Sequence, residues 1–362
     1  MIEISPSRLP PQSKPSLIFP ATDETIARAA ALLASSHLVG IPTETVYGLA
    51  ANAWDPLAVR KIFAAKSRPP SNPLIVHVAG IDRLDDAMQW PPSPLVRKQL
   101  DAIIDLWPGP LTVVCPRSSR IPDEVTAGRD TVAVRVPAHD VAIALLEACD
   151  FPIAAPSANR SKYISPTKAE HLFGQSGLGE YISMVLDGGP CRWGVESTII
   201  KLGEEVPKML RPGAVSLAEL ARRFGVPPEA MLQNEVAAEN RGEPTSFTAP
   251  GMMREHYCPT TPLMLLSAGQ PAIECIDTPP GNQKIARIAF RALSADEASR
   301  YFAVETLSTS GDMLEVAHHL FAALRRLDAE GLDMIHCDTC EPTGMGHAIM
   351  DRLQRAAART QG

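Results

Sequence analysis

Hydrophobic and polar positions follow one another along the first two thirds of the chain in a way that is typical of an α/β protein. Apolar residues at helical spacing follow Thr22 and Asp23, either of which can cap a helix. This spacing predicts helices at residues 22–33, 57–65, 96–106 and 217–224. Short apolar runs predict strands at residues 38–41, 74–78, 111–115, 131–136, 153–155, 184–186, 197–202 and 209–211. Helices and strands in this order predict a mixed sheet with helices.

The composition changes after residue 224, which indicates a second unit. Residues 227–250 are polar and are interrupted by Gly242 and Pro244, so we expect a linker there. From residue 262 the pattern predicts strands at 263–266, 285–290 and 334–337 and helices at 314–327 and 348–358. This second α/β unit is long enough for a small domain. The start of the chain is rich in proline and is expected to be an extended lead-in.

Composition and charge narrow the class of protein. Proline contributes 34 of the 362 residues, but 45% of the residues are apolar. A chain this apolar can bury a core, so the prolines predict fixed turns rather than disorder. Lysine and arginine number 34 against 41 acidic residues, a formal net charge of −7. The whole protein therefore offers no basic field for nucleic acid, and any site for a polyanion must be local.

The sequence predicts a soluble, cytoplasmic protein. Its longest purely apolar stretch, residues 141–146, is far shorter than the roughly 20 residues that span a bilayer. We find no apolar signal core at the N-terminus. Seven scattered cysteines fit a reducing compartment better than a disulfide framework. The common motifs of P-loop enzymes, dinucleotide-binding folds, zincins and serine hydrolases are also missing from the sequence.

Polar side chains are unusually dense directly after the strand predicted at residues 38–41. Residues 43–48 read Thr-Glu-Thr-Val-Tyr-Gly. Such a segment can form a binding loop, or it can be a polar turn that caps the next helix. Its composition alone leaves both interpretations open.

Two cations and a buried charge are the next candidates. Lys66 and Arg68 lie in a segment stiffened by prolines, which can hold positive charge for a phosphate with little ordering cost. A solvated basic pair is the alternative. His77 lies in an apolar run, where a core histidine is the alternative to a ligand-binding one. Arg135 lies in a valine-rich strand, so it must be paired or face a cavity. It can grip a carboxylate or form a structural salt bridge.

Further polar residues stand where other predicted strands begin or end. They are Ser-Ala-Asn at 157–159, Ser-Pro-Thr at 165–167, Asp-Gly-Gly at 187–189, Glu-Ser-Thr at 196–198 and Leu-Arg-Pro-Gly at 210–213. In α/β sheets, ligand sites lie at strand ends and in the loops that flank them. These segments are therefore expected to meet at one site.

Taken in order, these motifs resemble those of the YrdC-like family. The resemblance rests on residues 43–48, 66–69, 72–77, 107–112, 156–159, 165–167, 196–198 and 210–213. Residues 250–252, Pro-Gly-Met, and 256–259, His-Tyr-Cys-Pro, resemble the linker of the long, two-domain threonylcarbamoyl-AMP synthases. Each motif alone is weak, but their common order is specific.

The resemblance implies an architecture and an activity. It implies an extended lead-in at 1–16, a YrdC-like catalytic domain with a twisted mixed sheet at 17–224, a linker at 225–261 that closes the active site, and a smaller Rossmann-like α/β domain at 262–362. It implies synthesis of L-threonylcarbamoyladenylate from L-threonine, bicarbonate and ATP, with release of pyrophosphate. This nucleotidyltransferase reaction is the first step of threonylcarbamoyladenosine formation in tRNA. Downstream transferase machinery would use the product, and direct tRNA contact stays open.

The resemblance also assigns roles to residues. It places L-threonine against Thr45, His77, Arg135 and Ser197. It places ATP against Lys66, Arg68, Asn72, Thr131, Ser157, Ser165, Arg211 and Tyr257. Lys66, Arg68 and Arg211 fit catalytic charge neutralisation, and Mg²⁺ is expected with ATP. The sequence names no metal ligand and no proton-transfer residue.

Two segments depart from the family pattern, and two other functions remain as alternatives. Ser161, Lys162 and Tyr163 stand where Ser-Gly is common, and residues 253–255 are less basic and aromatic than usual. One alternative is an O-carbamoyltransferase, which shares the YrdC-like module but adds zinc-binding cysteine pairs. The other is a non-catalytic RNA-binding regulator, which the net charge of −7 disfavours.

Overall fold

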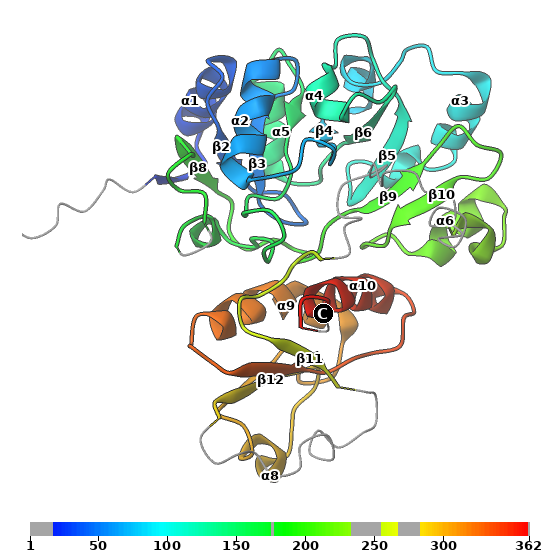
Figure 1. Cartoon of the computed structure of the whole chain (residues 1–362). Helices are drawn as coiled ribbons and strands as arrows, with labels where there is room; N and C mark the ends of the chain where they lie inside the picture. The colour runs from blue at the N-terminus through cyan, green and yellow to red at the C-terminus, as the bar shows by residue number, and fades with distance from the viewer. Residues whose placement is uncertain (1–16, 175–176, 233–254, 267–282, 361–362) are drawn as a thin grey trace, which may run out of the picture.

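The computed structural model describes residues 17–174, 177–232, 255–266 and 283–360. It contains two β-sheets in two domains, which lie one above the other in Figure 1. The strand order is β1-β8-β2-β3-β7-β4-β6-β5-β9-β10 in the larger sheet and β11-β14-β12-β13 in the smaller one. We call residues 17–232 the N-terminal domain and the residues around the smaller sheet the C-terminal domain.

The N-terminal domain is a mixed sheet with helices on it. Its strands are β1 Ile18–Pro20, β2 Val39–Ile41, β3 Gly48–Asn52, β4 Ile75–His77, β5 Leu111–Pro116, β6 Thr131–Arg135, β7 Ile153–Ala154, β8 Met184–Asp187, β9 Thr198–Lys201 and β10 Lys208–Arg211. Its helices are α1 Asp23–Ala34, α2 Pro56–Lys66, α3 Pro94–Asp101, α4 Asp123–Thr126, α5 Asp140–Glu147 and α6 Leu217–Phe224. The twisted mixed sheet predicted from the sequence is confirmed.

Helix α2 shows how local sequence places a functional side chain. Asp55 caps its first turn by accepting a hydrogen bond from the backbone of Leu57, and Pro56 occupies the first turn. The helix ends at Lys66, because Ser67 adopts a left-handed conformation with φ of 51°. The Lys66 side chain is buried although it sits at a helix end.

Strand pairing brings residues distant in sequence together. Strands β4 and β6 run parallel, with His77 opposite Arg135. Strand β7 pairs with β4 from the other side in the antiparallel direction, with Ile153 opposite His77. These three strands form the centre of the large sheet. His77 and Arg135 are the last residues of β4 and β6, so they lie side by side where these two strands end.

The structure differs from the predicted elements in a few places. Strand β3, Gly48–Asn52, was not predicted, because its sequence lacks β-branched and aromatic residues. The helix predicted at 96–106 ends at Asp101 as α3, and a short 3-10 helix, Ile104–Leu106, follows it. Strand β1, helices α4 and α5 and, in the C-terminal domain, helix α8 (Ala295–Ala298) and strand β13 (Ala303–Thr306) were also not predicted from the spacing.

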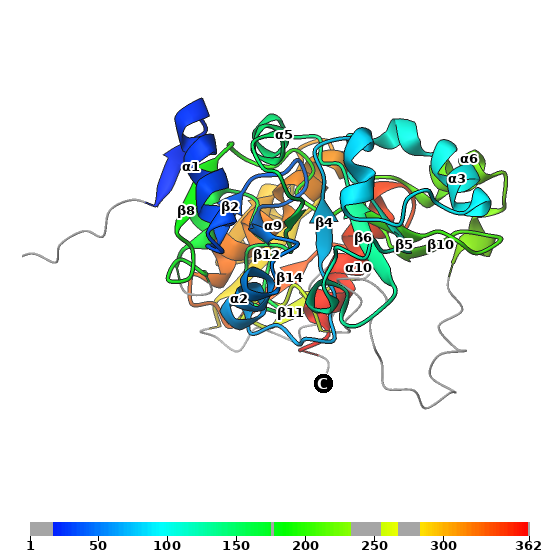
Figure 2. The ribbon, with the colours of Figure 1, turned by 90° about the horizontal axis from the view of Figure 1, so that it is seen from above.

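The C-terminal domain is an all-parallel sheet with its two longest helices on one face. Its elements are β11 Leu263–Leu265, β12 Ile285–Ala289, α8 Ala295–Ala298, β13 Ala303–Thr306, α9 Met313–Asp328, β14 Met334–Cys337 and α10 Met345–Ala357. Figure 1 shows α9 and α10 between this sheet and the N-terminal domain, and in the view from above in Figure 2 they lie behind strands of the large sheet. Most of the linker predicted at 225–261 lies outside the described residues.

A hydrophobic core continues across the boundary between the domains. Val46, Ile164 and Val195 of the N-terminal domain are buried in one cluster with Leu320 and Phe321 of α9. The two domains therefore share packing, and the C-terminal domain is attached directly to loops of the larger sheet. Among the described residues, none of the helices is long and apolar enough to span a membrane.

Candidate functional site

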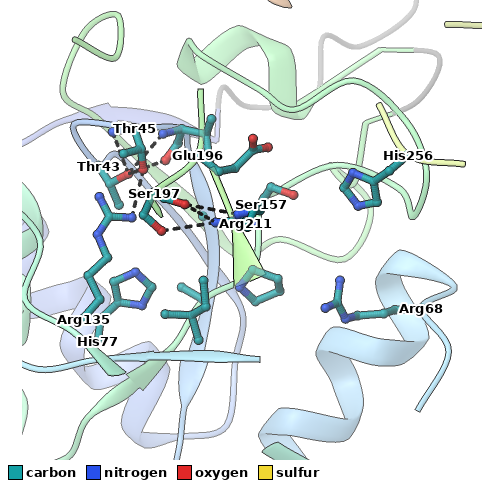
Figure 3. Close-up of a pocket in the computed structure, with 15 residues that line it drawn as sticks. Thr43, Thr45, Arg68, His77, Arg135, Ser157, Glu196, Ser197, Arg211 and His256 are labelled. Carbon is teal, nitrogen blue, oxygen red and sulfur yellow. Dashed lines mark hydrogen bonds between the residues drawn. The ribbon is translucent and has the colours of Figure 1, made fainter. Parts of the chain in front are cut away.

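A pocket opens among the loops that leave the strands of the large sheet, next to the C-terminal domain. Its walls are formed by Thr43, Thr45, Val46, Gly48, Arg68, Ile75, His77, Arg135, Ala155, Pro156, Ser157, Glu196, Ser197, Arg211 and His256. Figure 3 shows Arg135, His77 and Thr45 on one side, Arg68 and His256 on the other, and Arg211 with Ser197 between them. The cavity measures about 50 Å³. Ligand sites usually measure roughly 300 to 1,000 Å³, so the space in this conformation is small.

The loop between β2 and β3 builds one wall of the pocket. The hydroxyl of Thr43 donates to the carbonyl of Val46 at 2.6 Å and lies 2.9 Å from the hydroxyl of Thr45. The backbone N–H of Thr45 donates to the Thr43 hydroxyl at 3.2 Å. Both threonines are buried. The segment is therefore a rigid loop that turns hydroxyls into the pocket, and it leads into a strand rather than a helix.

Arg135 is held at the base of this wall. Its Nη1 donates to the Thr45 hydroxyl at 2.9 Å, its Nε donates to the carbonyl of Gly109 at 3.3 Å, and its Nη2 lies 2.6 Å from Glu44 Oε1. The side chains of Glu44 and Arg135 are each only 4% exposed. Arg135 thus forms a salt bridge and also faces the pocket, so both sequence-based interpretations apply to it.

His77 stands beside Arg135 as a neutral histidine. Burial, and secondly the charge of Arg135, lower the pKa of His77 to about 3. Its Nδ1 is buried and has no hydrogen-bond partner among the described residues. A neutral, unpaired ring nitrogen at a pocket wall can bind a hydroxyl or an amine of a ligand.

Lys66 and Arg68 form a cationic wall on the opposite side. The Lys66 ammonium donates to the carbonyls of Ser157 and Asn159. Arg68 donates through Nε to the carbonyl of Asn72 at 3.0 Å and through Nη2 to its side-chain oxygen at 2.6 Å. Within the described ranges no carboxylate forms a salt bridge with Lys66 or Arg68.

The pKa values of these cations reflect buried positive charge. Burial, and then Arg68, lower the pKa of Lys66 well below its ordinary value. Burial, and then Arg211, lower the pKa of Arg68 to about 9. Buried cations that repel one another and bond only to neutral carbonyls favour an incoming anion. The wall therefore has the electrostatics of a phosphate site.

Arg211 and Ser197 lie between the two walls. The Arg211 guanidinium donates to the carbonyl of Ser197 at 2.9 Å and to its hydroxyl at 3.2 Å. The Ser197 hydroxyl also lies 2.8 Å from the hydroxyl of Thr112. Both residues stand at strand termini, since β9 begins at Thr198 and β10 ends at Arg211.

Glu196 is the only carboxylate among the described residues of the pocket wall. Its Oε1 accepts a hydrogen bond from the Ser165 hydroxyl at 2.5 Å, and its Oε2 lies 2.9 Å from Nε of Arg352. Burial by itself would raise the pKa of Glu196, but Arg352 and Arg211 lower it to about 2. Glu196 is therefore an engaged, ionised carboxylate.

The segment that precedes the C-terminal domain closes the pocket. His256 lines it, and burial lowers the pKa of His256 to about 3. Tyr257 is fully buried behind it and stacks on Phe321 of α9 with ring centroids 5.4 Å apart. The Tyr257 hydroxyl has no hydrogen-bond partner in the described part of the chain.

The structure gathers most of the residues that the sequence singled out. Thr45, Arg68, His77, Arg135, Ser157, Ser197 and Arg211 line the pocket. Lys66, Asn72, Ser165 and Tyr257 lie directly behind this lining and contact it or its neighbours. Thr131 stands at the opposite end of β6, about 13 Å of strand from Arg135, and does not line the pocket.

Sequence reasoning gave no role to several residues at this site. Glu196 and His256 stood inside recognised motifs but were not assigned a function. Arg352 lies in the C-terminal domain, where the sequence predicted no site residue. A signal did exist, because Arg352 falls on the apolar face of α10 with Ile349, Leu353 and Ala356, where a charge needs a partner.

Comparisons with known proteins place the chain in a family. The Sua5/YciO/YrdC family model, described as "Telomere recombination", matches residues 31–213. A second model, described as "Threonylcarbamoyl-AMP synthase, C-terminal domain", matches residues 215–358. The chain belongs to the Sua5/YciO/YrdC family. The resemblance found in the sequence is confirmed.

Individual members of this family extend the similarity over almost the whole chain. The threonylcarbamoyl-AMP synthase of Bacillus subtilis is 38% identical over 92% of this chain and 93% of its own length. A crystal structure of Pyrococcus abyssi Sua5 with L-threonine is similar with a TM-score of 0.80 and 35% identity, over 95% of this chain and 97% of that one.

A shorter relative matches only part of the chain. The putative threonylcarbamoyl-AMP synthase of Mycobacterium leprae is 36% identical over 57% of this chain and 91% of its own length. Part of this chain is therefore not shared by every relative.

Proposed function

We propose that this chain is an L-threonylcarbamoyladenylate synthase, a nucleotidyltransferase that uses L-threonine, bicarbonate and ATP and releases pyrophosphate. One observation carries the proposal: the same pocket joins a wall suited to an amino acid, with Arg135, Thr45 and His77, to a wall of buried cations suited to phosphates. The full-length similarity to threonylcarbamoyl-AMP synthases, and to a relative crystallised with L-threonine, supports it.

The proposed chemistry requires placement and charge neutralisation more than a covalent nucleophile. The amine of threonine either adds to carbon dioxide and loses a proton, or displaces water from bicarbonate, and in both cases a carbamate forms. A carbamate oxygen then attacks the α-phosphorus of ATP, and the bond to the β-phosphate breaks to release pyrophosphate. Such a reaction gains most from holding both substrates together and from preorganised positive charge.

The amino-acid wall would bind L-threonine. Arg135 faces the pocket and can hold the threonine carboxylate while it keeps its contact with Glu44. The hydroxyls of Thr45 and Ser197 and the neutral ring of His77 can bind the remaining polar groups of threonine.

The cationic wall would bind and activate ATP. Lys66, Arg68 and Arg211 neutralise the phosphates and the negative charge that develops on pyrophosphate. The carbonyl of Ser157 binds Lys66, and the side chain of Asn72 binds Arg68. The hydroxyl of Ser165 binds Glu196. His256 and Tyr257 cover the nucleotide. We keep Thr131 as a candidate for a more distant part of ATP.

Magnesium would enter with ATP rather than occupy a protein site. No group of three or more histidine, cysteine, aspartate or glutamate residues in the described ranges is arranged to hold a metal ion. Both oxygens of Glu196 are engaged. When bound, Mg²⁺ would neutralise phosphate charge, with water and phosphate oxygens as its ligands. We propose that the product passes to a transferase that acts on tRNA.

The test is pyrophosphate release by the full chain. We expect release from ATP that requires both L-threonine and bicarbonate. Omission of either should reduce it to the background of ATP alone. Release that is indifferent to threonine contradicts the proposal, and release with carbamoyl phosphate in place of bicarbonate supports the carbamoyltransferase alternative.

A further inference from the structure

The side chain of Arg352 crosses from the C-terminal domain into the pocket wall of the N-terminal domain. It starts on α10 and is fully buried. Its Nε binds Glu196 Oε2 at 2.9 Å, and its Nη1 donates to the carbonyl of Pro212 at 2.8 Å. Its Nη1 also binds Asp351 Oδ2 at 2.7 Å, and its guanidinium lies 5.4 Å from the ring centre of Tyr257.

The two loops that Arg352 contacts each carry a pocket residue. Glu196 directly precedes Ser197, and Pro212 directly follows Arg211. The loops touch backbone to backbone, because a Cβ on Gly213 would lie 2.3 Å from the nitrogen of Thr198. One guanidinium therefore fixes two loops that are already in close contact.

The charge of Glu196 makes this contact matter for a phosphate ligand. Glu196 is buried within electrostatic reach of Lys66 and Arg211. A buried carboxylate in that position attracts the same cations that a triphosphate needs, and therefore competes with it. Arg352 engages one carboxylate oxygen from the side of α10, and Ser165 engages the other.

We propose that Arg352 is a positioning residue for nucleotide binding, which holds the Glu196 carboxylate toward the C-terminal domain so that Lys66, Arg68 and Arg211 remain available to phosphate. This inference rests on the proposed function, because it takes ATP as the ligand. The C-terminal domain thereby contributes to ATP binding in the pocket of the N-terminal domain. Without Arg352, Glu196 turns to the cationic wall and opposes the triphosphate.

The inference is tested by calorimetric titration of full-length variants with ATP and, separately, with L-threonine. We expect Arg352→Gln to weaken ATP binding about tenfold or more, while threonine affinity changes less than about twofold. Adding Glu196→Gln to this variant removes the competing charge and should restore most of the ATP affinity. Arg326→Gln is the matched control, because Arg326 is an arginine of α9 whose salt bridge with Glu305 stays within the C-terminal domain.

Two results of these titrations would overturn the inference. Equal losses of ATP and threonine affinity, without recovery in the double variant, show a merely structural role and overturn the inference. If Arg352→Gln does not fold by circular dichroism, the double variant carries the test, because it leaves no buried unpaired charge. A folded double variant that does not bind ATP overturns the inference as well.

Failure of the proposed function and failure of the role of Arg352 give different results. A wild-type chain that binds ATP but releases no threonine-dependent pyrophosphate contradicts the proposed function, while the ATP titrations still decide the role of Arg352. A wild-type chain that does not bind ATP contradicts both.

Discussion

The two walls of the pocket solve the problem of buried charge in different ways. On the amino-acid wall, Arg135 is neutralised by Glu44 of the same domain, and both belong to a network with Thr45. On the cationic wall, called the nucleotide wall below because we propose that it binds ATP, Lys66 and Arg68 bond to carbonyl oxygens and an amide, and each has its pKa lowered. The first wall is balanced before a ligand arrives, and the second is not.

The walls also differ in how many domains build them. Every described residue of the amino-acid wall comes from the N-terminal domain. His256 lines the nucleotide wall, Tyr257 packs behind His256, and Arg352 of α10 contacts Glu196. A balanced wall can bind a small ligand in a fixed geometry, whereas an unbalanced wall needs closure to exclude water and strengthen its electrostatics.

The largest expected effect is on the nucleotide wall. Lys66→Met should reduce pyrophosphate release about a hundredfold or more, because it removes a preorganised charge from the reacting phosphates. Threonine affinity should stay within about twofold. The measurements are steady-state kinetics and threonine titration. Lys61→Met is the matched control, since Lys61 lies on the same helix and bonds the carbonyl of Ser36.

An equal loss of threonine affinity in Lys66→Met would break the comparison, because the two walls would then act as one electrostatic unit.

A smaller effect is expected on the amino-acid wall. Arg135→Ala should raise the threonine KM about tenfold or more and leave the ATP KM nearly unchanged, because one bidentate contact to a carboxylate is lost. The measurement is pyrophosphate release at varied concentrations of each substrate.

Stability must be separated from binding in this variant. Arg135→Ala leaves Glu44 as a buried charge without its partner, which costs about 3 to 5 kcal/mol of folding free energy. Glu44→Gln with Arg135→Gln removes both charges and should show a smaller loss of thermal stability with the same selective loss of threonine binding. Equal increases in both KM values would reject the assignment of Arg135 to threonine.

The smallest expected effect is a proton taken up with ATP. Burial, and then Arg68, lower the pKa of Lys66 in the ligand-free chain. A bound triphosphate favours the charged ammonium and raises this pKa again. At a pH between the two values, ATP binding should therefore take up as much as about one proton. Calorimetry in buffers of different ionisation enthalpy measures this number.

Lys66→Arg is the control for proton uptake, because arginine stays protonated in proteins. Uptake that persists unchanged in Lys66→Arg would assign the proton to another group and weaken the contrast between the walls.

The sequence predicted much of the fold because its strands carry local signals. Valine-rich β6 and helix α6 with its serine cap and terminal glycine appear close to where they were expected. Strand β3 was not predicted, because small residues such as those at 48–52 have little intrinsic strand preference. Its pairing with the neighbouring strands β2 and β7 holds it in place.

The candidate site was predictable to the extent that its residues stand at strand ends. Arg135 was predicted to matter as a charge in a valine-rich strand, Lys66 and Arg68 as cations in a proline-stiffened segment, and Arg211 through the family resemblance. All four are buried at the pocket. Thr131 was assigned through the family resemblance and lies at the far end of its strand, so its role stays a prediction. The partner of Glu196 could not be found, because 156 positions separate it from Arg352.

The sequence by itself determined the α/β pattern, the second unit and the identity of the groups that can bind an amino acid and phosphates. Only the tertiary structure decided which charges neutralise one another. Electrostatic partners are chosen by distance in a low-dielectric interior, and that distance depends on how strands and domains pack. Glu44 therefore balances Arg135 within one domain, while Glu196 is held by an arginine from the other.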